Sequence, residues 1–201
     1  MHHLLILMGA YFLGAIPFGY MIVRLTQGGD IRQVGSGNIG ATNVFRSASK
    51  MGGVATLLLD AAKGYLAVLL ARKLLNDPTR SWEVAAAVLA IVGHIFTIFL
   101  KFKGGKGVAV GCGAYMAISP MAGLASILVF VVVMGISRYV SLGSIMATLA
   151  YPLSAYWFDE PKVVILGGGL GALLIIAKHH ANIRRLFTGR EHRLAASHKP
   201  S

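Results

Sequence analysis

Long uninterrupted runs of apolar residues are the feature that most constrains the fold of this 201-residue chain. Hydrophobic residues make up 56% of it and charged residues only 13%, whereas soluble domains carry about 25% charged residues on average. The apolar residues stand in blocks rather than in one-sided stripes, and a soluble core of this size could not bury them. The pattern therefore predicts an all-α integral membrane protein.

The lengths of these runs suggest how many helices cross the membrane. A spanning helix needs about 20 mostly apolar residues. Runs near or above that length occur at residues 4–25, 53–75, 82–100, 107–137, 140–158 and 163–177. As one helix the run 107–137 would measure about 46 Å, well beyond a hydrocarbon core of about 30 Å. It therefore forms either one overlong helix or two short ones broken at Ser119 and Pro120.

The distribution of Lys and Arg decides between these interpretations, because cytoplasmic loops are enriched in both. If the run 107–137 crosses twice, 14 of the 19 cations fall on one side and 4 on the other, with Lys63 inside a span. If it crosses once, the bias disappears. We therefore expect seven transmembrane helices, with the N-terminus outside and the C-terminus cytoplasmic. Residues 1–192 would form a single domain, and residues 193–201 a disordered cytoplasmic tail.

The first predicted cytoplasmic loop combines glycines, hydroxyls and amides with an arginine. Glycines let backbone N–H groups approach a ligand closely, and the guanidinium of Arg46 presents a fork that fits phosphate. The alternative is a tight turn with a topology-setting arginine. The glycine spacing also matches G-x-G-x-x-G, but a loop between spans is not the βαβ setting of a dinucleotide site. The candidate ligand-binding residues are Gly35, Ser36, Gly37, Asn38, Gly40, Thr42 and Asn43.

A second loop places Lys106 among Gly104, Gly105 and Gly107, which predicts an anion cradle containing a point charge. It is not a Walker A motif, because glycine rather than serine or threonine follows the lysine. His94, within the preceding apolar run, is more simply a hydrogen-bonded packing residue than a catalyst. Asp60 and Lys63 lie one turn apart inside a span, where ionised groups need partners, so we expect them to form an ion pair.

A third polar segment follows the last span, at residues 178–191, with His179 and Asn182 one helical turn apart. The alternative is a basic stretch that binds anionic lipid head groups. Ser141 and Ser144, between the fifth and sixth spans, add hydroxyls on the same side. Together these segments predict a phosphate-binding site at the bilayer edge, where a water-soluble phosphate could react with a lipid-soluble partner.

Three long motifs give the chain a close resemblance to the acyl-phosphate-dependent glycerol-3-phosphate acyltransferase family, the PlsY family. The resemblance covers essentially the whole chain. The motifs are GSGNIGATNVFR from Gly35 to Arg46, GHIFTIFLKFKGGKGV from Gly93 to Val108, and NIRRLFTGRE from Asn182 to Glu191, with His179 just before the last. Two departures are Thr97, where the family commonly has proline, and Val110, where a hydroxyl residue is common.

The resemblance implies a seven-helix enzyme in the bacterial cytoplasmic (inner) membrane, with its active site facing the cytoplasm. The implied reaction transfers a fatty acyl group from acyl phosphate to the 1-hydroxyl of glycerol 3-phosphate. Its products are lysophosphatidic acid and phosphate, in the first acylation step of phospholipid biosynthesis. The implied catalytic residues are Ser36, Arg46, Lys106, His179 and Asn182. The proton acceptor stays open between the substrate's own phosphate and His179.

The expected partners are glycerol 3-phosphate, fatty acyl phosphate, membrane lipids and the enzyme that makes acyl phosphate. We expect no cofactor, no metal ion and no nucleic acid. The main alternative is an organophosphate transporter or flippase, which would carry polar residues through the membrane and inverted repeats. Away from the ends of the predicted spans, only Asp60 and Lys63 are charged, and no repeat is visible. A non-catalytic lipid-binding scaffold is a weaker third interpretation.

Overall fold

The computed structural model describes residues 2–194, and all regular structure in that range is helical. This confirms the all-α prediction. Residues 195–201 of the expected tail lie outside the described range. In chain order the elements are α1 (His2–Ala15), α2 (Phe18–Gln27), η1 (Ile31–Gln33), α3 (Ala41–Ser47), α4 (Lys50–Leu75), α5 (Ser81–Ile95), η2 (Ile98–Leu100), α6 (Val108–Ile118), α7 (Pro120–Ser137), α8 (Val140–Trp157), α9 (Lys162–Ala177) and α10 (His180–Phe187).

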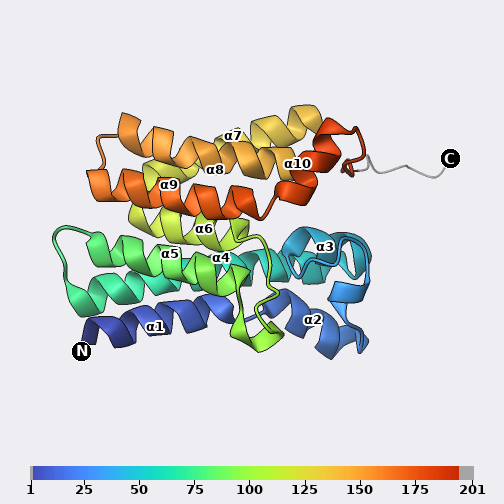
Figure 1. Ribbon diagram of the computed structural model, residues 1–201, viewed down its shortest axis with the longest axis horizontal. Coiled ribbons are helices and arrows are strands. Elements are labelled where there is room, and N and C mark those ends of the chain that lie inside the picture. The colour runs from blue at the N-terminus through green and yellow to red at the C-terminus, as the bar shows by residue number, and fades with distance from the viewer. Residues whose placement is uncertain (1, 195–201) are drawn as a thin grey trace.

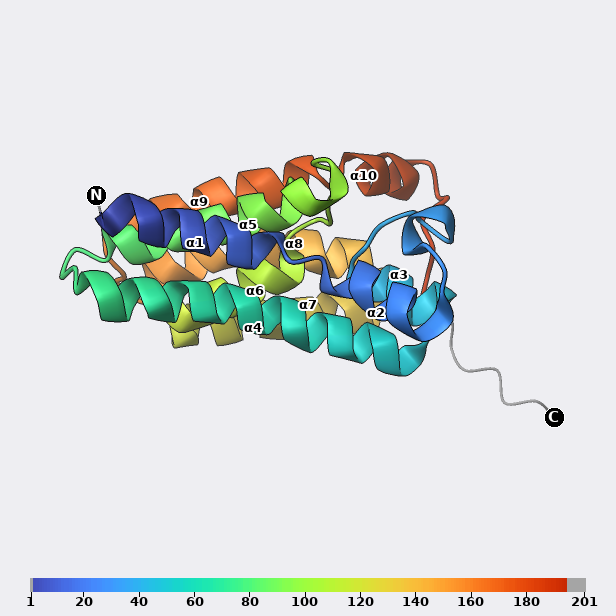
Figure 2. The same cartoon turned by 90° about the horizontal axis from the view of Figure 1, so that it is seen from below.

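The longer helices lie side by side along one axis (Figure 1). The short elements α2, α3 and α10 gather at the end opposite the N-terminus (Figure 2). Four stretches are long and apolar enough to cross a membrane, and α9 with α10 makes a fifth if the pair is one span bent by 63°. The four are residues His2–Gln27, Lys50–Leu75, Ser81–Leu100 and Pro120–Ser137.

The apolar run at residues 4–25 is interrupted near its middle, although its length predicts one continuous span. α1 ends at Ala15 and α2 begins at Phe18. Pro17 between them has no N–H to donate and disfavours helical geometry at the preceding residue. The carbonyl of Ile16, left without a helical partner, accepts a hydrogen bond of 2.6 Å from Lys63 Nζ.

The long run 107–137 divides into two helices, as one of the two interpretations required. α6 ends at Ile118 and α7 begins at Pro120, a residue favoured in the first turn of a helix because its missing N–H has no partner there anyway. The chain reverses direction at this break (Figure 1). α6 has 11 residues and is therefore only about 17 Å long.

The predicted ion pair inside the membrane-spanning region is confirmed. Lys63 Nζ lies 2.8 Å from Asp60 Oδ1, and both residues on α4 are only 2% exposed. The lysine also lies 3.1 Å from His94 Nδ1 on α5. His94 is thus hydrogen-bonded and buried, as expected for a packing residue. The cluster joins α4, α5 and the α1–α2 break.

Two arginines cover the C-terminal end of α6. Arg72 Nη2 donates to the carbonyl of Ala117 at 2.6 Å, and Arg80 donates to that of Ile118. The last carbonyls of a helix have no partner within it, and α6 ends inside the bundle. The arginine side chains therefore complete the hydrogen bonding at the buried end of this short helix.

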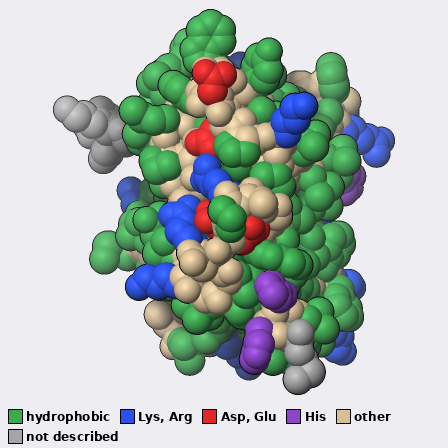
Figure 3. Space-filling model, turned by 90° about the vertical axis from the view of Figure 1, so that its left-hand side faces the viewer, with side chains coloured by type: hydrophobic (Ala, Val, Ile, Leu, Met, Phe, Trp, Pro, Cys, Tyr) green, Lys and Arg blue, Asp and Glu red, His purple; other side chains and the backbone are tan. Residues whose placement is uncertain are grey.

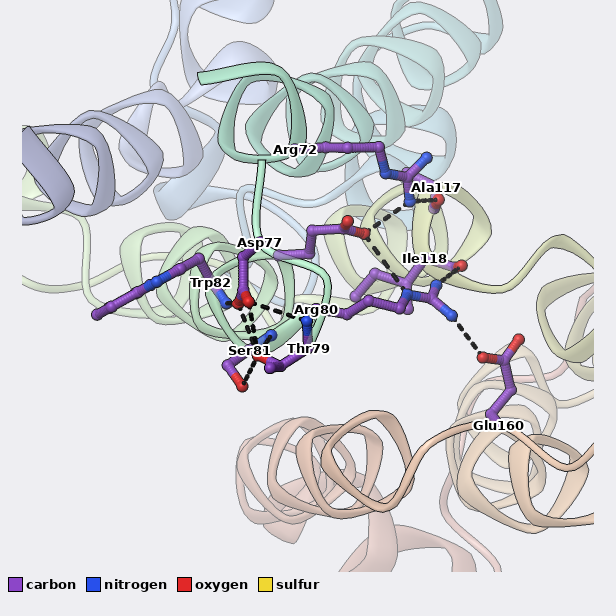
Figure 4. Close-up of polar contacts among 10 residues, drawn as sticks. Arg72, Asp77, Thr79, Arg80, Ser81, Trp82, Ala117, Ile118 and Glu160 are labelled. Atoms are coloured by element: carbon purple, nitrogen blue, oxygen red, sulfur yellow. Dashed lines mark hydrogen bonds and ion pairs between the residues drawn. The ribbon is translucent and has the colours of Figure 1, made fainter. Parts of the chain in front are cut away.

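Two glutamates neutralise these arginines. Glu83 accepts from Arg72 at 2.7 Å, and Glu160 accepts from Arg80 at 2.6 Å (Figure 4). Viewed from this end, the charges form a small mixed patch among hydrophobic side chains (Figure 3). The patch ties α4, α5, α6 and the α8–α9 turn together at the end remote from α2, α3 and α10.

Small residues let α4 and α6 pack with their backbones close together. A Cβ added to Gly64 would lie 2.1 Å from the carbonyl oxygen of Val110, and one added to Gly113 would lie 1.8 Å from that of Ala61. Close backbone approach through small residues is how membrane helices gain contact area, since lipid provides no hydrophobic drive for helices to associate.

We therefore expect Gly64→Ala to force α4 and α6 apart and destabilise the protein by about 1–3 kcal/mol, as overpacking does. The midpoint of thermal unfolding in detergent measures this. Gly169→Ala on α9 is the matched control, since no atom lies within 4 Å of an added Cβ there. Its midpoint should hold or rise, because alanine is favoured over glycine in helices by about 1 kcal/mol. Equal midpoints for both variants would refute the close-packing role.

Candidate active site

The first loop is organised from within by the buried side chain of Asn43 on α3. Its Nδ2 donates to the carbonyls of Ile31, Val34 and Asn38 at 3.2, 3.1 and 2.9 Å. Its Oδ1 accepts from the backbone N–H of Ser36 at 2.9 Å. One amide therefore fixes both sides of the loop, which makes Asn43 a residue that shapes the site.

The glycines of this loop differ in what they contribute. Gly35 and Gly37 have φ of +59° and +70°, in the left-handed region that favours glycine. A Cβ on Gly35 would also lie 2.3 Å from Asn43 Oδ1. Gly40 precedes α3 with negative φ, and its N–H donates to Asn38 Oδ1 at 2.8 Å. The side chain of Asn38 thus also holds the loop.

Ser36, Thr42 and Arg46 are the exposed polar residues of the first motif. Arg46 Nη2 lies 3.4 Å from the carbonyl of His192, which brings α3 to the segment that follows α10. The charge of Arg46 is close enough to help lower the pKa of Lys106. The structure therefore brings the first and second predicted loops together.

The glycines of the GGKG loop (residues 101–107) fold back on the end of α5. The N–H of Gly104 donates to Ile95 O and that of Gly105 to His94 O, both at 3.1 Å. These amides satisfy the terminal carbonyls of α5. The N–H donors of Gly104 and Gly105 are therefore already used by α5. Gly107, with φ +87°, turns the chain into α6.

Lys106 leads into a chain of polar contacts that ends at Glu191. Its Nζ donates to Asn182 Oδ1 at 2.5 Å, and Asn182 Nδ2 donates to Glu191 Oε1 at 2.7 Å. Glu191 also accepts from Ser141 Oγ at 2.8 Å and from Arg185 Nε at 2.7 Å. The carboxylate thus joins α8, α10 and the GGKG loop. Of the predicted residues, Lys106, Asn182 and Ser141 meet here.

Glu191 and Arg185 are central residues that were absent from the predicted site. One signal was available: Glu191 is the only acidic residue after Glu160, in a segment rich in Lys and Arg. Ser144, which was predicted, lies outside the cluster and donates to Val140 O on its own helix at 2.8 Å.

Burial and neighbouring charges shift the titration of this cluster. The pKa of Lys106 is lowered to about 8, mainly by desolvation; Glu191 opposes the shift, and the charges of Arg185 and Arg46 add to it. Burial opposes ionisation of Glu191, but hydrogen bonds from Asn182, Arg185 and Ser141 outweigh it and lower its pKa. Lys106 is therefore charged at neutral pH but loses its proton at a lower pH than an ordinary lysine.

His179 is held in one tautomer by its surroundings. Its Nδ1 lies 2.8 Å from the carbonyl oxygen of Ile175, which can only accept, so Nδ1 carries the proton. Nε2 is then left with a lone pair. Burial lowers the pKa of His179 to about 4, and the charge of Lys106 contributes to the shift. The imidazole is therefore neutral at physiological pH and can accept a hydrogen bond through Nε2.

The site brings together the ammonium of Lys106, the exposed guanidinium of Arg46, a serine hydroxyl and the neutral imidazole of His179 at one end of the apolar bundle. Such groups can bind phosphate and stabilise a developing oxyanion. No group of three or more His, Cys, Asp or Glu side chains suited to a metal ion occurs within residues 2–194.

Comparison with known proteins agrees with this chemistry. Residues 4–189 match the family model described as glycerol-3-phosphate acyltransferase. The chain is 45% identical to the glycerol-3-phosphate acyltransferase of Syntrophotalea carbinolica, covering 96% of this chain and 97% of the relative. It is 45% identical to that of Geobacter sulfurreducens, covering 93% of this chain and 95% of the relative.

Two solved structures of PlsY, an integral membrane glycerol 3-phosphate acyltransferase, share the fold. The glycerol 3-phosphate form is 41% identical with a TM-score of 0.91, and the lysophosphatidic acid form is 39% identical with a TM-score of 0.88. Each comparison covers 97% of this chain and 96% of the other. The chain therefore belongs to the glycerol-3-phosphate acyltransferase family and is a membrane acyltransferase of the PlsY type.

Proposed function

We propose that this enzyme transfers a fatty acyl group from acyl phosphate to the 1-hydroxyl of glycerol 3-phosphate. The products are lysophosphatidic acid and inorganic phosphate. The observation that carries the proposal is the convergence of Lys106, Arg46, His179 and Asn182 at one end of an apolar bundle. The similar PlsY structures, described with glycerol 3-phosphate and with lysophosphatidic acid, support the acceptor and the product.

The chemistry follows from the reactivity of acyl phosphate, a mixed anhydride whose phosphate is already a good leaving group. The 1-hydroxyl oxygen attacks the carbonyl carbon, and the bond from that carbon to the phosphate oxygen then breaks. Lys106 and Arg46 bind the charged phosphate and stabilise the oxyanion of the tetrahedral intermediate that forms between these two steps. Ser36 and Asn182 orient the bound groups, with Ser141 in support through Glu191.

The hydroxyl proton passes to a phosphate oxygen of the substrate. A phosphate monoester has a second pKa near 6, whereas the pKa of His179 is about 4, so the phosphate is the stronger base. His179 instead accepts a hydrogen bond at Nε2 from the 2-hydroxyl and so orients the glycerol, which leaves the proton of the 1-hydroxyl free to pass to the phosphate. This assigns both candidates for the proton acceptor a role in the reaction.

The proposed setting is the bacterial cytoplasmic membrane, crossed seven times, with this site on the cytoplasmic side. The 14-to-4 division of cations supports this orientation. So does the position of the N-terminus at the opposite end of the bundle from α2, α3 and α10 (Figure 1).

We expect the purified protein to convert acyl phosphate and labelled glycerol 3-phosphate into labelled lysophosphatidic acid, detected by chromatography. Acyl-CoA of the same chain length should give no product, because a thioester lacks the acyl-bound phosphate that Lys106 and Arg46 are proposed to bind. Efficient turnover with acyl-CoA would contradict the donor assignment, and no turnover with either donor would contradict the proposed reaction.

Lys106→Ala and Arg46→Ala should fold like the parent yet lose about 10²–10³-fold in turnover, by analogy with loss of one oxyanion-hole donor. Lys103→Ala is the matched control, since this exposed lysine lies in the same loop, and its effect should be mild. Arg46→Lys keeps the charge but not the fork and should stay impaired. Near-parental turnover of well-folded Lys106→Ala would require the site assignment to be withdrawn.

The pKa of Lys106 predicts an alkaline limb in the pH profile. Lys106 loses its charge as pH rises through about 8, so kcat/KM for glycerol 3-phosphate should fall there. This parameter reports groups of the free enzyme and free substrate, and the phosphate of the substrate should give a rising limb near pH 6. Lys106→Arg stays charged, so its falling limb should move to higher pH at a lower overall rate. An unmoved limb would assign it to another group.

A further inference from the structure

Three buried ionisable side chains lie beneath the GGKG loop and play no part in the site described above. They are Asp60 and Lys63 on α4 and His94 on α5, each 2–4% exposed. Charged groups at membrane depth are costly, and a cluster that served only to join α4 to α5 could be replaced by apolar residues. The contacts of the three groups give a more specific reason for their presence.

The ammonium of Lys63 has three donors, and three acceptors surround it. These are Asp60 Oδ1 at 2.8 Å, the carbonyl of Ile16 at 2.6 Å and Nδ1 of His94 at 3.1 Å. Because an ammonium can only donate, Nδ1 of His94 accepts, and the ring proton lies on Nε2. The contact with Lys63 therefore fixes both the tautomer and the orientation of the imidazole.

The far edge of that imidazole supports the GGKG loop. A Cβ added to Gly105 would lie 2.1 Å from His94 Nε2, so the backbone of Gly105 rests directly on the ring. The N–H of Gly105 also donates to the carbonyl of His94 at 3.1 Å. Gly105 is joined to Lys106, so any rotation of the ring displaces the residue that precedes the phosphate-binding lysine.

The same ammonium also reaches toward the first loop. Its acceptor, the Ile16 carbonyl, lies at the break before α2. On α2, Gly19 packs closely against the first loop, since a Cβ added there would lie 2.0 Å from Ile39 O. Lys63 therefore fixes the start of the helix on which the first loop rests. One buried charge is in contact with the supports of both loops of the site.

We propose that Asp60, Lys63 and His94 are positioning residues that set the distance between the GGKG loop and the first loop. This inference rests on the proposed role of Lys106 in phosphate binding. Loss of the cluster should weaken use of glycerol 3-phosphate while leaving the helix bundle assembled, because misplacement of a binding group by about 1 Å can cost about 10²-fold in rate.

The test compares the double variant Asp60→Asn/Lys63→Met with Tyr115→Phe. The double variant removes both charges together and leaves neither one unpaired. Tyr115→Phe is the control, because it removes a buried hydrogen bond of 3.0 Å to Gly167 O without touching either loop. Thermal unfolding, KM for glycerol 3-phosphate, kcat and amide hydrogen exchange of residues 101–107 are measured for each.

In the double variant KM for glycerol 3-phosphate should rise about 10–100-fold, and the amides of Gly104 and Gly105 should exchange faster. Tyr115→Phe should lower the unfolding midpoint yet leave both readouts at parental values. Parental KM and parental exchange in a folded double variant would overturn the proposal. If the double variant does not fold, Lys63→Arg is measured in its place, and its KM and amide exchange are judged in the same way. Hydrogen exchange is measured without substrate and therefore does not depend on activity. If the parent protein is inactive, the proposed reaction is refuted, but the exchange rates of Gly104 and Gly105 still test the positioning role.

Discussion

The carboxylate of Glu191 is the interaction on which the arrangement of the site depends. Arg185 and Arg46 lie close enough to Lys106 to help lower its pKa, and without an anion among them the three cations would repel. Glu191 supplies that anion and also accepts from Asn182 and Ser141. The free enzyme therefore keeps its cations assembled before any phosphate arrives. A bound phosphate adds charge to a site that is already formed.

The helical framework was largely predictable because the membrane imposes simple rules on it. Apolar runs of suitable length, the helix-breaking Pro120 and the pairing of Asp60 with Lys63 all follow from the absence of water in the hydrocarbon core. The break at Pro17 was missed because the run 4–25 has the length of one span. Pro17 breaks the helix locally, and the freed Ile16 carbonyl is then stabilised by Lys63, a tertiary partner 47 residues away.

The sequence predicted many of the residues that lie at the candidate site, but not where their hydrogen-bond donors point. The motifs correctly brought Lys106 near Asn182, yet the amides of Gly104 and Gly105 point to α5 and not to open space. Likewise Asn43 and Asn38 resemble ligand-binding amides in sequence, but their side chains hold the loop. Where a donor points is decided by the partner brought to it in the fold, and local sequence does not contain that partner.

The arginines that cover the end of α6 have a consequence for how the chain can evolve. Arg72 and Arg80 each bind one helix carbonyl, both pair with Glu83, and Arg80 also pairs with Glu160. Loss of any one member leaves a charge or a carbonyl without its partner at a helix end whose last residues, Ala117 and Ile118, are buried. Single substitutions are therefore selected against, whereas coordinated replacements can survive. Residues 72, 80, 83 and 160 should accordingly vary together among related sequences. A longer α6 whose last carbonyls reached the surface would remove the need for all four charged side chains.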